Sequence, residues 1–205
     1  WHPKPHAFYE KGSGPLFDMG PYYVSALVSL LGPVESVGAF GTKASPIRHI
    51  YVGEHAGEEI SAEEDTTFCA ILRLRSGVTV NLNITYDIYK SGLPAFEIYG
   101  DGGTLTYPDP NFGGGTPKVY RKEQYTDACY RDDEAAQKRK QSYYELPEVF
   151  TRFKDYSRGI GVQDLAAAIE SGTKNRANGE LILHVTEVLQ AIRESAEQGQ
   201  FICLK

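Results

Sequence analysis

Residues 78–86 read VTVNLNITY, in which apolar and polar side chains alternate with a period of two. This alternation predicts a β-strand with one buried face and one polar face. The preceding run, residues 68–74, alternates in the same way, and the Ser76-Gly77 pair between the two runs predicts a two-residue hairpin turn. Because short turns join only antiparallel strands, these residues predict an antiparallel sheet.

Other elements flank this hairpin on both sides. We expect further strands at residues 34–41, 49–53, 95–99, 103–107, 118–121 and 201–204. A first helix is expected from Pro21, after Gly20, to Gly32, because proline favours the first helical position and glycine favours the end of a helix. Two later helices are expected at 162–171 and 179–198, whereas residues 108–141 are expected to be mainly loop.

The order of these elements indicates the fold class. The strands form one block with helices before and after it, and no alternation of strand and helix is present. We therefore expect an α+β fold in which a large, predominantly antiparallel sheet carries helices on one face. Residues 1–205 are expected to form a single domain. Apolar side chains on the uncovered face of such a sheet need a partner, so we also expect a homo-oligomer.

Composition excludes several classes of partner. The formal net charge is −6, and the one basic cluster, residues 138–140, is offset by the acidic residues 132–134, which argues against a nucleic-acid partner. No apolar run approaches the roughly 20 residues that span a bilayer, and no signal peptide is apparent. Cys69, Cys129 and Cys203 lack metal-ligand spacing, so we expect a reducing, cytoplasmic location.

Two features of the N-terminal region bear on function. The chain begins at Trp1 without an initiator methionine, so we expect it to be part of a longer protein. Residues 12–23 read GSGPLFDMGPYY, which places Asp18 just before the expected helix and Tyr22 in its first turn, where the helix dipole favours a phenolate and hence proton acceptance. The alternative is structural: Asp18 bonds nearby amides, and Tyr22 and Tyr23 only pack.

Four parts of the chain resemble the C-terminal domain of the glucose-fructose oxidoreductase / inositol dehydrogenase (Gfo/Idh/MocA) family. They are residues 1–31, the hairpin EIYGDGGTL at 97–105, the loop PDPNFG at 108–113 and the helix at 175–199, and together they extend over essentially the whole chain. The resemblance implies a C-terminal domain like that of glyceraldehyde-3-phosphate dehydrogenase. It also implies an N-terminal Rossmann domain that these residues do not include.

The same resemblance implies an activity. Members of the family oxidise a secondary hydroxyl of a sugar or cyclitol, or reduce the ketone, by hydride transfer with NAD or NADP. The cofactor would be bound mainly by the missing N-terminal domain, and none is expected to bind this chain alone. The partners implied are a small sugar or polyol substrate and the chain's own Rossmann domain.

The family pattern Asp-x-Gly-x-His falls on Asp18-Met-Gly20-Pro-Tyr22. The match implies that Asp18 orients the substrate and assists proton transfer. Tyr22 stands where many members carry a catalytic histidine. We expect Tyr22 to accept the proton instead, beside a lysine from the missing half of the protein, because a positioned tyrosine next to a cation is a competent base.

Four further residues are candidates for substrate binding: Trp1, Tyr9, Arg176 and His184. The aromatic faces of Trp1 and Tyr9 suit the C–H surface of a sugar, although packing in the core is equally compatible with their position. Arg176 either contacts a substrate group or flanks a helix start. His184 either faces a cleft or is a packed, hydrogen-bonded residue.

No metal or dinucleotide site is expected in this chain. His2 and His6 are spaced by prolines and lack accompanying ligands, and the glycine runs at 100–103 and 113–115 favour turns because neither opens a helix. Two other functions stay open. A non-catalytic sensor or scaffold has the same expected fold, and a carbohydrate-binding module is supported by the 14 tyrosines but opposed by the C-terminal helices.

Overall fold

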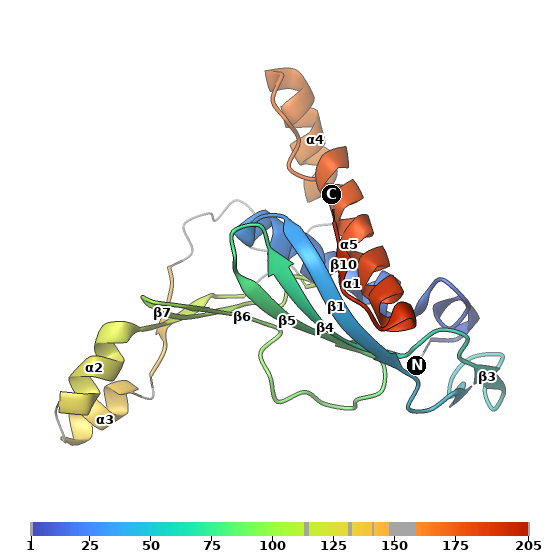
Figure 1. Ribbon diagram of the computed structural model, residues 1–205, viewed down its shortest axis with the longest axis horizontal. Coiled ribbons are helices and arrows are strands. Elements are labelled where there is room, and N and C mark those ends of the chain that lie inside the picture. The colour runs from blue at the N-terminus through green and yellow to red at the C-terminus, as the bar shows by residue number, and fades with distance from the viewer. Residues whose placement is uncertain (1, 113–114, 131–132, 141, 148–158, 205) are drawn as a thin grey trace. The chain divides into compact units, whose positions relative to one another are not determined.

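The computed structural model describes residues 2–112, 115–130, 133–140, 142–147 and 159–204. The chain divides into two compact units, residues 1–90 with 172–205 and residues 91–171 (Figure 1). The α+β class with antiparallel sheets is confirmed. Each unit has its own four-stranded sheet, so the strands that were expected in one large sheet are divided between two.

The first unit is built around the sheet that the alternating sequence predicts. Its elements are η1 (His6–Phe8), α1 (Gly14–Leu31), β1 (Val34–Thr42), β2 (Ile47–His49), β3 (Glu59–Ser61), β4 (Thr67–Leu74), β5 (Thr79–Thr85), α5 (Gly179–Gln198) and β10 (Ile202–Cys203). The four-stranded sheet has the order β10-β1-β4-β5 with antiparallel pairing throughout. β2 and β3 form a separate antiparallel pair.

The β4–β5 hairpin confirms the predicted alternation. Every second side chain of β4 is buried, and Ala70 pairs with Leu82 of β5. The turn is one residue longer than expected, because the backbone N–H of Leu74 donates to the carbonyl of Val78 at 2.9 Å and leaves three residues between them. Gly77 adopts φ +87°, which glycine tolerates without steric cost.

Helices α1 and α5 pack against the sheet and against each other (Figure 1). The core between them is apolar and consists of Leu16, Val24, Leu27, Val34, Val37, Phe68, Leu72, Leu74, Ile84, Val185, Val188, Leu189 and Ile192. Helix α5 has clear end signals: the side chain of Asn178 accepts bonds from two backbone N–H groups, and Gly199 ends it in the left-handed conformation. The predicted bounds of α5 are confirmed.

The predicted start of the first helix is wrong. α1 begins at Gly14, and Pro15 rather than Pro21 occupies its first turn. Pro21 lies inside the helix, where its ring removes one backbone donor. The Gly20-Pro21 pair was taken as a local helix start. The true start has its own local signal, Pro15, and Glu63 and Glu64 also bond the backbone N–H groups of Lys11 and Gly12 just before the helix.

The second face of this sheet is not covered by a helix of the first unit. Three large apolar side chains there are solvent-exposed: Phe40 by 80%, Ile71 by 54% and Phe201 by 73%. The Phe201 ring lies over Gly38, where an added Cβ would come within 2.6 Å of it. The apolar open face that the sequence predicts is therefore present.

The second unit contains the elements β6 (Phe96–Gly100), β7 (Gly103–Tyr107), β8 (Lys118–Arg121), α2 (Lys122–Tyr130), α3 (Glu134–Lys140), β9 (Tyr144–Glu145) and α4 (Ile160–Ser171). Its sheet has the order β6-β7-β8-β9. The prediction that residues 108–141 are mainly loop is wrong for α2 and α3. Those helices lack a strong apolar stripe, and the buried Gln124 side chain instead bonds the backbones of Arg121, Arg139 and Ser142.

Candidate functional site

Asp18 and Tyr86 form a hydrogen-bonded pair on the first unit. The Tyr86 hydroxyl donates to Oδ2 of Asp18 at 2.6 Å. Asp18 lies in the first half of α1, and its side chain is solvent-exposed. Tyr86 follows the last residue of β5, and the two-residue period of the strand points it to the same side as the buried Ile84. Because α1 packs on β5, the helix carboxylate and the strand-end phenol meet.

The Tyr86 phenol is held in its protonated form. Burial, the hydrogen bond to Asp18 and the negative charge of that carboxylate raise the pKa of Tyr86 well above its ordinary value. The ring also meets Tyr9 edge-on, with the two centroids 5.8 Å apart. Tyr86 is therefore a fixed hydrogen-bond donor at neutral pH, not a base.

An ion pair lies immediately beside this aromatic contact. Arg48 of β2 pairs with Asp87, and its guanidinium carbon is 5.7 Å from the centroid of the Tyr9 ring. Asp87 also accepts bonds from the hydroxyls of Thr66 and Thr67, each at 2.7 Å. Burial alone would raise the pKa of Asp87, but these bonds and the Arg48 charge outweigh it and lower that pKa.

Residues 63–67, here called the anchoring segment, bond both the loop before α1 and the residues that follow β5. The backbone N–H of Glu63 donates to the carbonyl of Tyr9 at 2.8 Å, and the Glu63 carboxylate accepts from the N–H of Lys11. At the other end of the segment, the Thr66 carbonyl accepts from the N–H of Tyr86 at 2.9 Å. The anchoring segment therefore connects the N-terminal loop with the end of β5.

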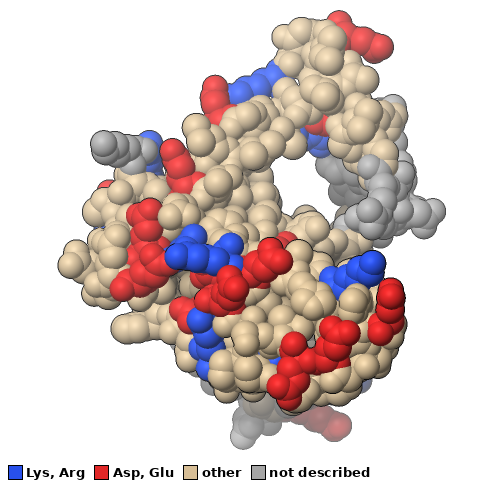
Figure 2. All heavy atoms as spheres, turned by 90° about the vertical axis from the view of Figure 1, so that its right-hand side faces the viewer, with Lys and Arg blue, Asp and Glu red and all other residues tan. Residues whose placement is uncertain are grey.

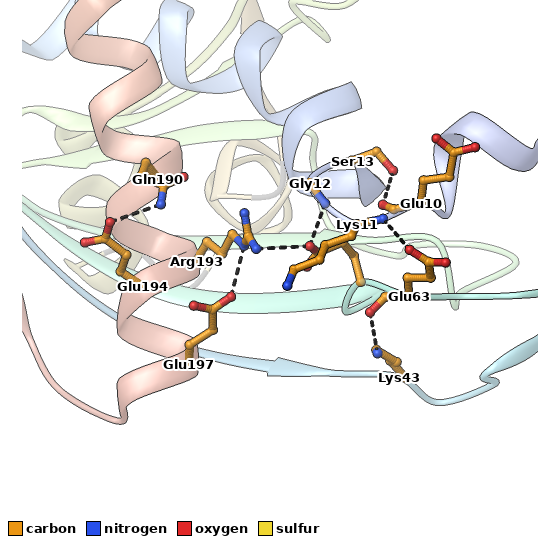
Figure 3. A network of polar contacts seen from close by, with 11 residues as sticks. Glu10, Lys11, Gly12, Ser13, Lys43, Glu63, Gln190, Arg193, Glu194 and Glu197 are labelled. Atoms are coloured by element: carbon orange, nitrogen blue, oxygen red, sulfur yellow. Dashed lines mark hydrogen bonds and ion pairs between the residues drawn. The ribbon is translucent and has the colours of Figure 1, made fainter.

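Glu64 of the anchoring segment holds the start of α1. Its Oε1 accepts from the N–H of Gly12 at 2.6 Å and lies 3.2 Å from Nη2 of Arg193 on α5 (Figure 3). Arg193 also bonds Glu197 one turn along α5 at 3.0 Å. Because Asp18 belongs to α1, these bonds also help to fix the position of its carboxylate.

Tyr22 lies one helical turn after Asp18, and residues four apart share a helix face. It is 48% exposed, so its hydroxyl is accessible. The expected effect of the helix dipole on Tyr22 is wrong, because α1 starts at Gly14 and Tyr22 is in its third turn, whereas the dipole acts mainly within the first turn. The side-by-side placement of Asp18 and Tyr22 comes from the helix itself.

The four expected substrate-binding residues do not lie together. Tyr9 lies in the site, against Tyr86 and Arg48. His184 of α5 accepts a bond at Nε2 from the backbone N–H of Val34, beyond the C-terminal end of α1, whereas Asp18 lies near the other end. Arg176 is exposed in the loop before α5. Trp1 lies outside the described residues.

Sequence reasoning missed Tyr86, Arg48 and Asp87. Tyr86 was assigned only to the buried face of a strand, although its position at the strand end next to a helix was a signal. Arg48 and Asp87 are 39 residues apart in the chain, and no local pattern connects them. Their pairing arises from the long loop around β2 and β3.

Acidic and basic side chains are mixed on one face of the molecule. The face in Figure 2 shows Lys and Arg next to Asp and Glu, with no large region of one sign. In the described part of the chain, no group of three or more His, Cys, Asp or Glu side chains is arranged to hold a metal ion. No helix among the described residues is both long and apolar enough to cross a membrane.

The family of this chain follows from its similarity to a known family of domains. Residues 1–106 match the family model described as the GFO/IDH/MocA C-terminal domain. The chain belongs to this family. The match includes α1, β4, β5 and the residues of the Asp18–Tyr86 pair. No curated protein matches the chain.

Solved structures of several oxidoreductases have the same fold. An NAD-binding oxidoreductase from Klebsiella pneumoniae is 21% identical over 95% of this chain and 51% of its own, with a TM-score of 0.69. Levoglucosan dehydrogenase in its apo form is 18% identical over 100% of this chain and 56% of its own, with a TM-score of 0.73. Aldose-aldose oxidoreductase from Caulobacter crescentus, complexed with glycerol, is 16% identical over 100% of this chain and 52% of its own, with a TM-score of 0.66. The chain thus spans about half the length of each of these three proteins.

Proposed function

We propose that this chain is the substrate-binding part of an NAD(P)-dependent oxidoreductase that acts on a secondary hydroxyl, or the corresponding ketone, of a sugar or cyclitol. The observation that carries the proposal is the exposed Asp18 carboxylate, held by Tyr86 and with the accessible Tyr22 one helical turn away. Levoglucosan dehydrogenase with NADH and L-sorbose, and the aldose-aldose oxidoreductase, are among the structures with this fold, which supports the reaction class.

In this proposal Asp18 orients the substrate and Tyr22 accepts its proton. The Asp18 carboxylate accepts a hydrogen bond from the substrate hydroxyl and so orients it. Bound NAD(P) would supply the hydride acceptor. Tyr22, in the deprotonated form that a neighbouring lysine of the N-terminal half would favour, would accept the proton of the substrate hydroxyl. Tyr9 contributes an aromatic surface beside Tyr86 for the C–H groups of the substrate. Arg176, His184 and Trp1 remain weaker candidates for contacts with it.

Neither the glycine turn at residues 100–103 nor the backbone amides before α1, both in the described part of the chain, suits a dinucleotide. Gly100 and Gly103 join β6 to β7, and an added Cβ at Gly103 would lie 2.0 Å from the Tyr120 carbonyl oxygen, so this glycine serves sheet packing. The N–H groups of Lys11 and Gly12, before α1, are bonded by Glu63 and Glu64 and do not face a phosphate. We therefore assign NAD or NADP to the N-terminal half of the protein.

We also propose that the open sheet face is the surface through which the protein forms a homo-oligomer. The exposed Phe40, Ile71 and Phe201 support this assignment, since large apolar groups gathered on one sheet face favour association. Phe40→Lys is expected to lower the oligomeric state measured by sedimentation. A reducing, cytoplasmic location suits the exposed free thiols of Cys69 and Cys203.

The test of function uses the protein in its full natural length. It would be incubated with a panel of sugars and cyclitols and with NAD or NADP, and absorbance of the reduced nicotinamide would be followed. Asp18→Asn and Tyr22→Phe are each expected to lower kcat at least about 100-fold. Glu170→Gln, an exposed carboxylate on α4, is the control and should leave turnover unchanged.

The outcomes separate the candidate functions. Turnover that is lost in Asp18→Asn and Tyr22→Phe but retained in the control supports the enzyme and both assignments. Normal turnover in Tyr22→Phe would exclude Tyr22 as the base. Binding of cofactor and polyol without turnover of any substrate would instead identify a sensor or scaffold.

A further inference from the structure

Within the described part of the chain, the Asp18 carboxylate is hydrogen-bonded through one of its oxygens. Its Oδ2 accepts from the Tyr86 hydroxyl at 2.6 Å. A carboxylate that is anchored through one oxygen has lost most of its rotational freedom about χ2, while its other oxygen keeps its lone pairs for a ligand. Since Asp18 is exposed, that second oxygen is accessible.

Tyr86 is itself held from several sides. Its backbone N–H bonds the Thr66 carbonyl at 2.9 Å, and its ring meets Tyr9 at a centroid distance of 5.8 Å. The next residue, Asp87, is fixed by Thr66, Thr67 and Arg48. The phenol therefore reaches Asp18 from a rigid support, which is the arrangement that positions a reacting group well.

The bond adds little to folding by itself. Asp18 is exposed and Tyr86 is only half-buried, so water replaces much of the bond when it is broken. A comparable pair lies on β6, where the exposed Tyr99 donates to Glu97 at 2.5 Å and Thr106 also donates to Glu97 at 3.1 Å. The two phenol–carboxylate bonds are chemically alike, but only the first lies beside the accessible Tyr22.

From this geometry we infer that Tyr86 is a positioning residue for the reaction, which holds Asp18 through Oδ2 so that Oδ1 accepts the substrate hydroxyl. The inference rests on the proposed function. It gives the two tyrosines near Asp18 opposite roles: Tyr86 keeps its proton and donates, whereas Tyr22 accepts the proton of the substrate. The raised pKa of Tyr86 agrees with its role as a hydrogen-bond donor.

The decisive experiment is a double-mutant cycle in the full-length protein, with the steady-state kinetics of a polyol substrate as the readout. Tyr86→Phe is expected to lower kcat about 10- to 100-fold while KM changes less than about threefold, because a misplaced orienting group weakens catalysis more than binding. In the Asp18→Asn background, Tyr86→Phe should have no further effect, since Tyr86 acts through Asp18. Tyr99→Phe is the matched control and should behave as wild type.

Two results would overturn the inference. If Tyr86→Phe is as active as wild type, the positioning role fails while the proposed function stands. If the losses caused by Tyr86→Phe and Asp18→Asn multiply, Tyr86 does not act through Asp18. A wild-type protein that is inactive on every polyol would instead overturn the proposed function, and this inference with it.

A second readout tests the bond without turnover. The 13C chemical shift of the Asp18 carboxyl carbon is measured at pH 7 in wild type, in Tyr86→Phe and in Tyr99→Phe. Loss of the Tyr86 phenol is expected to change this chemical shift, because the carboxylate exchanges a fixed donor for water, whereas Tyr99→Phe should leave it unchanged. An unchanged chemical shift in Tyr86→Phe would overturn the inference, and thermal unfolding of each variant verifies that the fold is intact.

Discussion

Gly20 of α1 lies so close to Leu189 of α5 that an added Cβ would be 2.6 Å from Cδ2 of the leucine. This is shorter than any normal van der Waals contact, so a side chain at position 20 would force the buried Leu189 side chain to shift. Both helices lie over the sheet, and α1 carries Asp18 and Tyr22. The distance between α1 and α5 therefore helps to determine where Asp18 and Tyr22 lie.

Gly20→Ala is expected to destabilise the protein by about 1–3 kcal/mol, because the new methyl group overpacks the contact with Leu189. Urea unfolding followed by circular dichroism measures this change. Gly161→Ala in α4 is the control. No atom lies within 4 Å of its added Cβ, so there the higher helix propensity of alanine should stabilise or leave stability unchanged. Equal effects in the two variants would contradict the close contact.

Glu64→Gln is expected to cost about 2 kcal/mol, because it weakens the charge-assisted bond to the Gly12 N–H and removes the ion pair with Arg193. The same unfolding measurement tests it. Glu194→Gln, whose carboxylate accepts from Gln190 on the surface of α5, should change stability by less than about 0.5 kcal/mol. If the Glu64 variant is as stable as this control, the anchoring segment does not hold α1.

Asp87 is expected to make stability sensitive to acid. Its pKa in the folded protein lies below the unfolded value of about 3.9, so its stabilisation is present above pH ~4 and is lost as the pH falls through the folded pKa. Unfolding between pH 2 and 7 should therefore show a smaller loss on acidification for Asp87→Asn than for wild type. Identical pH profiles would show that Asp87 contributes nothing to acid sensitivity.

Asp65 is expected to affect the pH dependence of stability in the opposite direction to Asp87. Burial raises its pKa, and Glu64 and Glu197 raise it further against the lowering effect of Lys43. A raised folded pKa stabilises the protein at low pH and loses that contribution as the pH rises through it, so the charged Asp65 costs stability at pH 7. Asp65→Asn should stabilise by about 0.5 kcal/mol at pH 7 and give no gain at pH 3. A destabilised variant at pH 7 would contradict this sign.

The sequence predicted the elements that depend on local periodicity. The hairpin of β4 and β5 and the helix α5 were correct because alternation, the N-cap Asn178 and Gly199 are all short-range signals. The start of α1 was wrong because two Gly-Pro pairs, Gly14-Pro15 and Gly20-Pro21, give the same local signal, and the second was chosen. α2 and α3 were missed because one buried polar side chain, Gln124, replaces the apolar stripe that marks most helices.

The candidate site was predicted only in part. Asp18 and Tyr22 were identified from their spacing and from the family pattern, and Tyr9 from its aromatic character. Tyr86 joins them only because α1 crosses the end of β5, and such a crossing has no signature within either segment.

The anchoring segment lets one short stretch of chain determine two positions at once. Residues 63, 64, 66 and 67 bond the loop before α1, the carbonyl of Tyr9 and the backbone and carboxylate that follow β5. A single residue inserted into the anchoring segment would therefore displace the supports of Asp18 and of Tyr86 together, whereas an insertion in the loop after Asp87 would leave both supports in place.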